Sequence, residues 1–330
     1  MQCDDKYDYR GKSILVTGGA GSIGREIVKK LIEKEPKVIR VMDNNETGLF
    51  FLNEEMNSPL IRPLLGDIRD KDRLNRACED IDIVIHTAAL KHVPLCEYNP
   101  FDAVLTNIMG TQNLLDASIS QNVERFVLVS TDKAVEPNNV MGATKLLSER
   151  LTVSANNYKG KHRTKFSCVR LGNVLNSRGS VIPLFRTQLE RGQPVTVTDP
   201  DMTRFIMSLD KAVQLILMSG SRAEGGDIFI LKMSAIRIMD LAEVMVEDYG
   251  ESLRANQKSI VFLGKRPGEK MHEHLMTADE ASHAIDGGDV FIIKSDPGSG
   301  VGPEHYSSNL IKPLDKGEIR RLLQEPTCGP

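Results

Sequence analysis

The fold is decided near the N-terminus by residues 13–24, which read SILVTGGAGSIG. Ser13–Thr17 is a short β-branched run of the kind that forms a buried strand. It leads directly into glycines in the pattern G-x-G-x-x-G, which permit a tight turn and let a pyrophosphate approach the backbone. Free N–H groups at the start of the following helix attract phosphate. The stretch therefore predicts a dinucleotide-binding turn, with contacts from Gly18, Gly21, Ser22, Ile23 and Gly24.

An acidic residue at the end of the next predicted strand indicates which dinucleotide binds. Asp43 follows Val38–Met42, about 20 residues after the last glycine, where a carboxylate reaches the ribose hydroxyls. Such a carboxylate repels a 2′-phosphate, and the neighbouring Asn44 has no positive charge to offset this repulsion. The pattern favours NAD, and NADP is left open because Arg69 could lie near the same position.

Strand-like and helix-like runs alternate through the first half of the chain. The predicted strands are Ser13–Thr17, Val38–Met42, Arg62–Leu65, Asp82–His86, Phe126–Ser130 and Lys165–Leu171. The predicted helices are Ser22–Lys34, Glu46–Met56, Asp70–Cys78, Asp102–Ser120 and Asn139–Tyr158. This alternation predicts an α/β fold with a doubly wound parallel sheet that is covered by helices on both faces.

The alternation of predicted strands and helices ends after residue 171, where the segments become shorter and richer in Gly, Pro and Arg. We expect residues 1–172 to form an NAD(P)-binding Rossmann domain that also carries the catalytic residues. Residues 173–330 are expected to form mainly a smaller, mixed α/β substrate-binding domain, interleaved with the first. Within it we predict helices at Leu209–Met218, Asp240–Tyr249 and Lys316–Leu323, and a loop at Ser295–Pro303.

A cluster of reactive side chains follows the predicted strand Phe126–Ser130. Thr131, Asp132 and Lys133 come directly after it, and Met141 opens a helix that carries Lys145 one turn later. The carboxyl ends of strands in an open α/β sheet face the ligand crevice. We therefore expect these five side chains at the site of chemistry.

The chain resembles the extended short-chain dehydrogenase/reductases, whose active-site helix carries Y-x-x-x-K where this sequence has Met141-x-x-x-Lys145. More narrowly, TDKA followed by MGATK is similar to the nucleotide-sugar 4,6-dehydratases that act on UDP-N-acetylglucosamine, several of which carry Met in place of Tyr. The resemblance extends from about Gly11 to Leu323. Other matching stretches are AALKHVP (88–94), EYNPFDAVLTN (97–107), RLGNVLNSRGSVIPLF (170–185), MTRFIM (202–207) and RPGEKMHE (266–273).

The resemblance implies a three-step reaction: oxidation at C4 of the sugar, elimination of water across C5 and C6, and hydride return to C6. Lys145 is expected to bind the nicotinamide ribose, Lys133 to act as the base at C5 and Asp132 as the acid at O6. Because a thioether cannot accept a proton, Asp132, Thr131 or a water molecule must take the 4-hydroxyl proton instead of Met141. For Lys133 to be a base its pKa must fall, and we expect burial and neighbouring positive charge to lower it.

The resemblance also implies the remaining ligand contacts. A UDP-sugar carries two phosphates, which the guanidinium groups of Arg204 and Arg266 suit. Additional cofactor contacts are expected from Asn44, Asp67, Ile68, Ala88, Ala89 and Lys91. Substrate contacts are expected from Lys91, Asn173, Arg204, Arg266 and Glu269.

Composition limits the partners and the location. A net charge of −3 and a pI near 6.2 argue against a protein that coats nucleic acid. No apolar run approaches the ~20 residues that cross a bilayer, so we expect no membrane insertion and a cytoplasmic protein. His272 and His274 lack the H-E-x-x-H spacing, so no metal is expected. The predicted helices 102–120 and 139–158 carry broad apolar faces, and in relatives the matching helices form a homodimer contact.

Two other functions fit parts of the sequence. An NAD-dependent UDP-hexose 4-epimerase uses the same cofactor cycle but has no need of an acid–base pair at C5 and C6, so Asp132 and Lys133 favour the dehydratase. A non-catalytic NAD(H)-sensing regulator is suggested only by Met141. The preferred sugar nucleotide is left open, as is the configuration at C5, where the compact chain favours inversion over retention.

Overall fold

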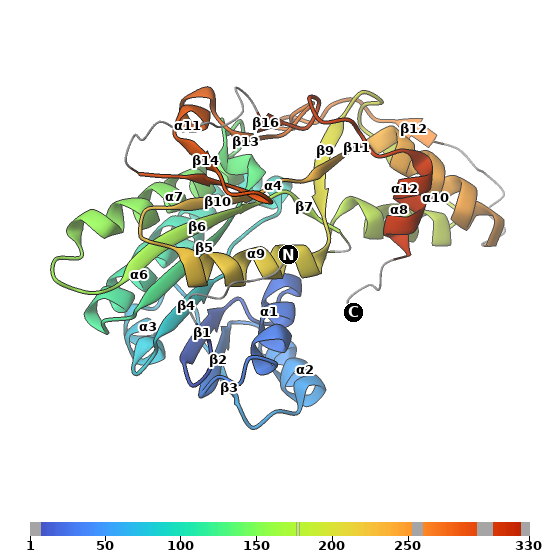
Figure 1. Cartoon of the computed structure of the whole chain (residues 1–330). Coiled ribbons are helices and arrows are strands. Elements are labelled where there is room, and N and C mark those ends of the chain that lie inside the picture. Colours follow the sequence, from blue (N-terminus) through green and yellow to red (C-terminus); the bar gives the residue numbers. More distant parts are fainter. Residues whose placement is uncertain (1–7, 176, 178, 253–259, 296–305, 325–330) are drawn as a thin grey trace.

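The largest element of the computed structural model, which describes residues 8–175, 177, 179–252, 260–295 and 306–324, is a nine-stranded sheet (Figure 1). The order of its strands is β14 (Ala284–Asp286), β15 (Val290–Ile293), β10 (Ile228–Leu231), β6 (Lys165–Leu171), β5 (Arg125–Thr131), β4 (Ile83–His86), β1 (Ser13–Thr17), β2 (Val38–Asp43) and β3 (Ile61–Leu65). Neighbouring strands from β3 to β10 are parallel, whereas β15 and β14 are antiparallel additions.

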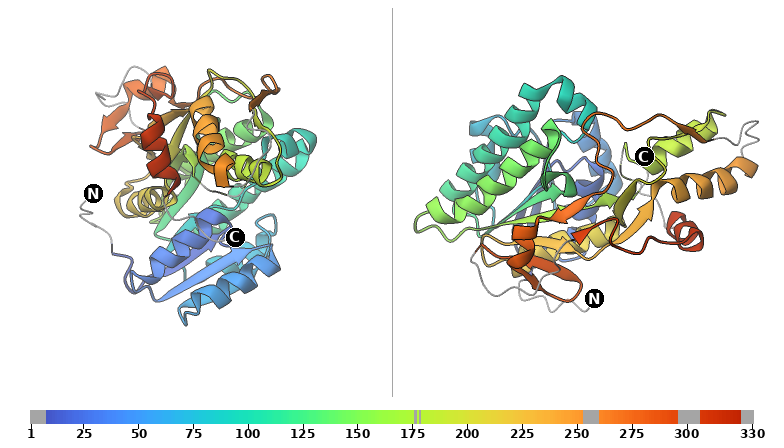
Figure 2. Two further views of the ribbon diagram at one scale, coloured as in Figure 1. Left: turned by 90° about the vertical axis from the view of Figure 1, so that its right-hand side faces the viewer. Right: turned by 90° about the horizontal axis from the view of Figure 1, so that it is seen from above.

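Helices cover both faces of this sheet (Figures 1 and 2). On one face α1 (Ser22–Ile32) packs against α9 (Leu209–Arg222). On the other lie α3 (Lys71–Cys78), α6 (Gly110–Ser120) and α7 (Val140–Tyr158), while α2 (Glu46–Met56) packs beside β2 and β3. All residues of β1 are buried, as expected for a parallel strand covered on both faces. The predicted doubly wound α/β fold is confirmed, with most element ends within a few residues of those predicted.

The glycine turn after β1 depends on close backbone contacts. Gly18 has a φ of +69°, and a Cβ there would lie 2.6 Å from the backbone nitrogen of Ala88. A Cβ on Gly24 would lie 2.3 Å from the carbonyl oxygen of Gly18. Only glycine at both positions lets α1 begin directly against the end of β1 and leaves its first N–H groups facing the crevice.

The predicted continuous helix Asp102–Ser120 was wrong in detail. The chain forms α4 (Val93–Tyr98), α5 (Pro100–Ala103) and a π-helical segment, Val104–Met109, before α6. Within that segment the side chain of the buried Asn107 bonds the backbone N–H and the carbonyl of Leu90 at 2.8 and 3.0 Å. These contacts account for a wider turn, which helical periodicity alone does not predict.

A second, smaller core lies beside the large sheet, at the right of Figure 1. Its helices are α8 (Val181–Glu190), α10 (Ile238–Ser252) and α12 (Lys316–Leu323). Its strands are β7 (Asn173–Val174), β9 (Thr203–Met207) and β11 (Ser234–Arg237) in one sheet, and β8 (Val195–Val197) with β12 (Ile260–Phe262) in another. The predicted loop after Ser295 lies outside the described residues. Within the part of the chain that the structure describes, no helix is both long and apolar enough to cross a membrane.

A buried arginine joins the two halves of the chain. Arg170, on β6, is 1% exposed and donates to both oxygens of Glu149 on α7. It also donates to both oxygens of Glu280, on α11 (Ala278–Ser282), and to the carbonyl of Leu275, on β13 (His274–Met276). β13 pairs with β16 (Tyr306–Ser307). One guanidinium therefore connects the large sheet, the helix that carries Lys145 and the C-terminal segment.

We predict that Arg170→Met destabilises the protein by about 3–5 kcal/mol, because it leaves two buried carboxylates without their cation. Urea unfolding measures the loss. The matched control is Arg163→Met, which removes an exposed partner of Glu124 and should cost no more than about 1 kcal/mol. Equal losses in the two variants would contradict the role given to Arg170.

Candidate active site

Two adjoining cavities, of about 830 and 760 Å³, open at the carboxyl ends of the parallel strands. The first follows the glycine turn and the ends of β1, β2, β4 and β5. The second lies between the 3-10 turn Asp132–Ala134, α8, β9 and residues 266–273. The two cavities share the lining residues Lys133, Asn173, Val174, Gly179 and Ser180. A ligand in one cavity would therefore meet a ligand in the other beside Lys133.

The first cavity collects every residue that the sequence analysis assigned to the cofactor. Those residues are Gly18, Gly21, Ser22, Ile23, Gly24, Asp43, Asn44, Asp67, Ile68, Ala88, Ala89, Lys91 and Lys145. The start of α1 supplies the free N–H groups that suit a diphosphate. Lys91 lines only this cavity, so the structure does not bring it to the second cavity, where its substrate contact was also expected.

Acidic side chains mark the far end of the first cavity. Asp43 accepts hydrogen bonds from the backbone N–H groups of Ala20 and Asn45, both at 3.0 Å, which fixes its carboxylate beside the glycine turn. Arg69 donates to both oxygens of Asp67 and holds the pKa of that carboxyl below its usual value. The charge of Arg69 is thus already offset by Asp67.

Hydrogen bonds fix the loop after β4 at two points. Asn107 binds both backbone groups of Leu90 and also donates to the Oγ1 atom of Thr144 on α7 at 2.9 Å. Thr87 donates to the carbonyl oxygen of Thr17 at 2.7 Å. The backbone of Ala88 and Ala89 is therefore fixed where it lines the first cavity.

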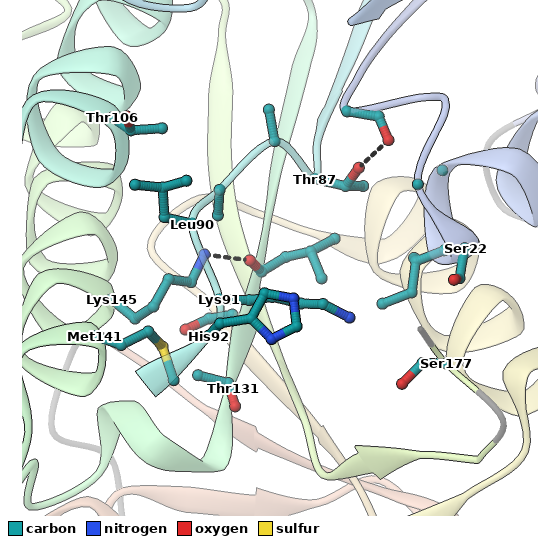
Figure 3. A pocket seen from close by; sticks show the side chains of 18 of the residues that line it. Ser22, Thr87, Leu90, Lys91, His92, Thr106, Thr131, Met141, Lys145 and Ser177 are labelled. Atoms are coloured by element: carbon teal, nitrogen blue, oxygen red, sulfur yellow. Dashed lines mark hydrogen bonds between the residues drawn. The ribbon is translucent and has the colours of Figure 1, made fainter. Parts of the chain in front are cut away.

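Lys145 and Met141 project from α7 into the first cavity (Figure 3). The Nζ atom of Lys145 donates to the carbonyl oxygen of Val129 at 2.7 Å. Burial lowers the pKa of Lys145 to about 8. Met141 is buried against Cys96 and Ala103, so the position usually held by tyrosine is filled by an apolar side chain.

Asp132 and Lys133 form a close pair with different exposures. Asp132 is fully buried, and its Oδ1 atom accepts hydrogen bonds from the hydroxyl of Thr131 at 2.8 Å and from the Nζ atom of Lys133 at 2.9 Å. Lys133 lines both cavities, whereas Asp132 lines neither.

The expected lowering of the Lys133 pKa was wrong for the ligand-free protein. Burial alone would lower that pKa, but the carboxylates of Asp132 and Glu273 outweigh it and raise the pKa above its usual value. Lys133 therefore carries a proton at neutral pH, and it must pass that proton to another group before it can accept one from a sugar.

The second cavity contains the predicted substrate residues Asn173, Arg204, Arg266 and Glu269. Arg204 donates to the backbone carbonyls of Thr203, Lys270 and Met271, and lies near two carboxylates. Its guanidinium is thus largely occupied, contrary to the expected diphosphate clamp. Arg266 is exposed at the edge of the cavity and remains the better placed of the two arginines for a phosphate.

Two residues of the site were not predicted. Glu273 belongs to the stretch RPGEKMHE, which the sequence analysis quoted but assessed only for a metal site. It is 2% exposed and lines the second cavity next to Lys133. Asn107 closes the stretch EYNPFDAVLTN, and a polar residue on the apolar face of a predicted helix was the signal that could have identified it.

The fold and the two cavities define an extended short-chain dehydrogenase/reductase, and comparison with known proteins narrows this class. Residues 14–295 match the family described as polysaccharide biosynthesis protein, and the chain belongs to that family. A relative from Methanocaldococcus jannaschii, described as an uncharacterized membrane protein, is 54% identical over 96% of each chain. The UDP-N-acetylglucosamine 4,6-dehydratase (inverting) of Campylobacter jejuni is 41% identical over 83% of this chain and 80% of its own. A UDP-glucose 4-epimerase from Rickettsia bellii is 38% identical over 94% of this chain and 95% of its own.

Solved structures agree with this assignment. Pen from Bacillus thuringiensis superposes with a TM-score of 0.94 at 45% identity, covering 98% of this chain and 100% of its own. The dTDP-glucose 4,6-dehydratase DesIV from Streptomyces venezuelae was solved with NAD and TYD bound. It has a TM-score of 0.69 at 26% identity, covering 78% of this chain and 86% of its own. The predicted family resemblance is confirmed.

The lowered pKa of Lys145 predicts a pH-dependent contribution to stability. Its pKa is about 8 in the folded chain and about 10.4 when unfolded, so between these pH values the unfolded chain binds more protons and stability rises with pH. Relative to Lys145→Met, the wild-type protein should gain on the order of 2 kcal/mol of unfolding free energy between pH 7.5 and about pH 10. A difference between the two proteins that is constant with pH would contradict the assignment.

Proposed function

We propose that the protein is an NAD-dependent UDP-N-acetylglucosamine 4,6-dehydratase that produces a UDP-4-keto-6-deoxy sugar for surface polysaccharide or glycan synthesis. The observation that carries the proposal is the Asp132–Lys133 pair at the end of β5, where the two cavities meet. Dehydration needs acid–base groups at C5 and C6 beside a cofactor that oxidises C4, and this arrangement supplies both. The 41% identical dehydratase of Campylobacter jejuni supports the same reaction.

The first cavity fits NAD. Gly24 and the start of α1 suit the diphosphate, Asp43 suits the ribose hydroxyls, and the buried Lys145 suits the nicotinamide ribose. NAD is favoured over NADP because Asp43 faces the cavity while the nearest arginine, Arg69, is held by Asp67. When bound, the nicotinamide supplies the hydride acceptor for C4 and the hydride donor for C6.

The 4-hydroxyl proton needs an acceptor other than tyrosine. Thr131 lines the first cavity and donates its hydroxyl proton to Asp132 at 2.8 Å. We assign the proton path to this pair: Thr131 accepts the proton from O4 as it passes its own to Asp132. Met141 excludes water beside Lys145 and takes no part in proton transfer.

Once C4 is a ketone, the C5 hydrogen becomes acidic. Lys133 is the amine that faces both cavities, which supports its assignment as the base at C5. Loss of the C5 proton drives out the 6-hydroxyl as water, and C5 regains a proton when C6 has received hydride. The cofactor ends the cycle oxidised, so no external reductant is consumed.

A UDP-hexose 4-epimerase is the second candidate, favoured by the 38% identical relative from Rickettsia bellii. An epimerase oxidises C4 and returns hydride to the opposite face of the same carbon. It has no use for a base at C5, so the position of Lys133 favours dehydration. A non-catalytic NAD(H) sensor would have no use for Lys133 where the two cavities meet.

We also propose a cytoplasmic homodimer. Large apolar side chains are exposed on α4, on α5 and in the π-helical segment, which follow one another in the chain, and on α7, against which all three pack. They are Leu95, Tyr98, Phe101, Met109 and Leu147. A second copy of the chain would cover this surface through the same helices on both subunits.

The reaction is tested by incubating the protein with NAD and UDP-N-acetylglucosamine and following the sugar by NMR. A 4-keto-6-deoxy product, with a new methyl signal, is the expected result. A C4 epimer would instead support the epimerase, and absence of turnover would support the sensor.

The role of Lys133 is tested in the same assay with solvent deuterium. Wild-type protein should place deuterium at C5, because the proton removed by Lys133 exchanges with water. Lys133→Ala should lower the rate of this exchange by at least about 100-fold, the usual contribution of a general base. Unchanged exchange would remove Lys133 from the base role.

A further inference from the structure

The short segment that joins the 3-10 turn to α7 lies at the centre of the site. Asp132–Ala134 form the turn at the end of β5, and the side chain of Asn139 caps the start of α7. A Cβ on Gly142, in the first turn of that helix, would lie 2.3 Å from the carbonyl oxygen of Lys133. The turn and the helix are thus in close backbone contact, and the position of residues 135–139 affects both.

Lys270 connects this segment to the wall of the second cavity, which it lines. Its Nζ atom donates to the carbonyl oxygen of Val135, the residue that follows the turn. Val135 is buried, and its own N–H donates to the carbonyl oxygen of Asp132 at 3.1 Å, which closes the turn. The backbone carbonyl of Lys270 accepts from Arg204 on β9 at 2.9 Å. Lys270 therefore links the residue that closes the turn to a strand of the smaller core.

A second contact joins the same two parts of the chain. The Nδ2 atom of Asn139 donates to the carbonyl oxygen of Gly268 at 2.9 Å, while its Oδ1 atom accepts from the N–H of Gly142 at 2.8 Å. Gly268 has a φ of +73°, and a Cβ there would lie 3.0 Å from the Cβ of Asn139. Glycine at position 268 thus lets the stretch that carries Arg266 pack closely against the start of α7.

The half-buried Lys270 also lies among the charges of the site. Burial lowers its pKa below the usual value, and the carboxylates of Glu273, Asp132 and Glu136 only partly offset this. The ammonium of Lys133 lowers the pKa of Lys270 further. Because the two amines interact, loss of Lys270 would change the charge around Lys133 as well as the hydrogen bond to Val135.

We infer that Lys270 is a positioning residue for the step at C5, because its bond to Val135 holds the turn, and with it the amine of Lys133, against the second cavity. This role rests on the proposed dehydratase function and adds a residue to it. Thr131 is paired with Leu171 of β6, so the sheet holds it independently, whereas Lys133 lies beyond the paired part of β5. Loss of Lys270 should therefore impair proton removal at C5 more than oxidation at C4.

The test compares wild-type protein, Lys270→Met and Lys270→Arg in the deuterium-exchange assay with NAD and UDP-N-acetylglucosamine. In Lys270→Met we expect the maximal rate of exchange at C5 to fall at least about 10-fold, because misplacing a reacting group by about 1 Å costs up to about 100-fold. The initial rate of nicotinamide reduction and the dissociation constant of UDP should change by less than about threefold. Lys270→Arg keeps a donor but cannot accept a proton, and it should exchange within about threefold of the wild-type rate.

The control is Lys265→Met, which removes the same charge from an exposed position in the same connection between β12 and β13. Lys265 lines neither cavity, so all three quantities should stay unchanged. Normal exchange in Lys270→Met, or loss of exchange in Lys270→Arg as well, would overturn the inference. A UDP dissociation constant raised at least about 10-fold would also overturn it, because Lys270 would then be a phosphate ligand.

The pH dependence of exchange separates position from charge. Removal of a nearby positive charge raises the pKa of Lys133, so a role through charge alone would move the profile of Lys270→Met to higher pH and leave its maximum unchanged. That result would overturn the inference, which expects a lower maximum.

Urea unfolding and NAD binding show whether each variant has kept its fold. If Lys270→Met fails either measurement, Lys270→Gln takes its place, and failure of both variants would overturn the inference in favour of a general structural role. Absence of C4 oxidation in the wild-type protein would instead refute the proposed function.

Discussion

The ion-pair network of Arg170 is the constraint on which the rest of the site depends. This guanidinium binds Glu149 on the helix that carries Met141 and Lys145, and it binds Glu280 and the Leu275 carbonyl in the C-terminal segment. Leu275 lies two residues after Glu273, so one cation links the helix that carries Lys145 to the segment that carries the buried Glu273 carboxylate. Charges this deep in a protein are tolerated only when fully paired, which makes the arrangement rigid.

A balance of charges explains how the site can work without a tyrosine. Two carboxylates, on Asp132 and Glu273, surround two cations, on Lys133 and Arg204. A proton that passes from Lys133 to one of these carboxylates stays within the group and leaves its net charge unchanged. Lys133 lies close to both carboxylates and can exchange a proton with either of them. A methionine at position 141 is compatible with this arrangement, because none of these contacts involves it.

Local sequence was enough to predict the first cavity. The glycine turn, Asp43 and the residues after β5 all lie at strand ends, and strand ends meet at one edge of a parallel sheet whatever the later topology. The position of Glu273 depends instead on pairing between β13 and β16 and on hydrogen bonds with Ser308, contacts that no local pattern encodes. The direction of the Lys133 pKa was mispredicted because the carboxylate of the adjacent Asp132 raises it strongly and because Glu273, which raises it further, was not yet placed beside it. Arg204 was misjudged because two of its three carbonyl partners come from residues more than sixty positions later.

The central claim is that Thr131 and Asp132 handle the proton of O4 while Lys133 removes the proton from C5. A crystal structure of the protein with NAD and UDP-N-acetylglucosamine bound tests it most directly. The account predicts O4 within hydrogen-bond distance, about 2.6–3.2 Å, of the Thr131 hydroxyl, and the Nζ atom of Lys133 beside C5. A complex in which O4 makes no contact with Thr131, or in which C5 lies out of reach of Lys133, would contradict it.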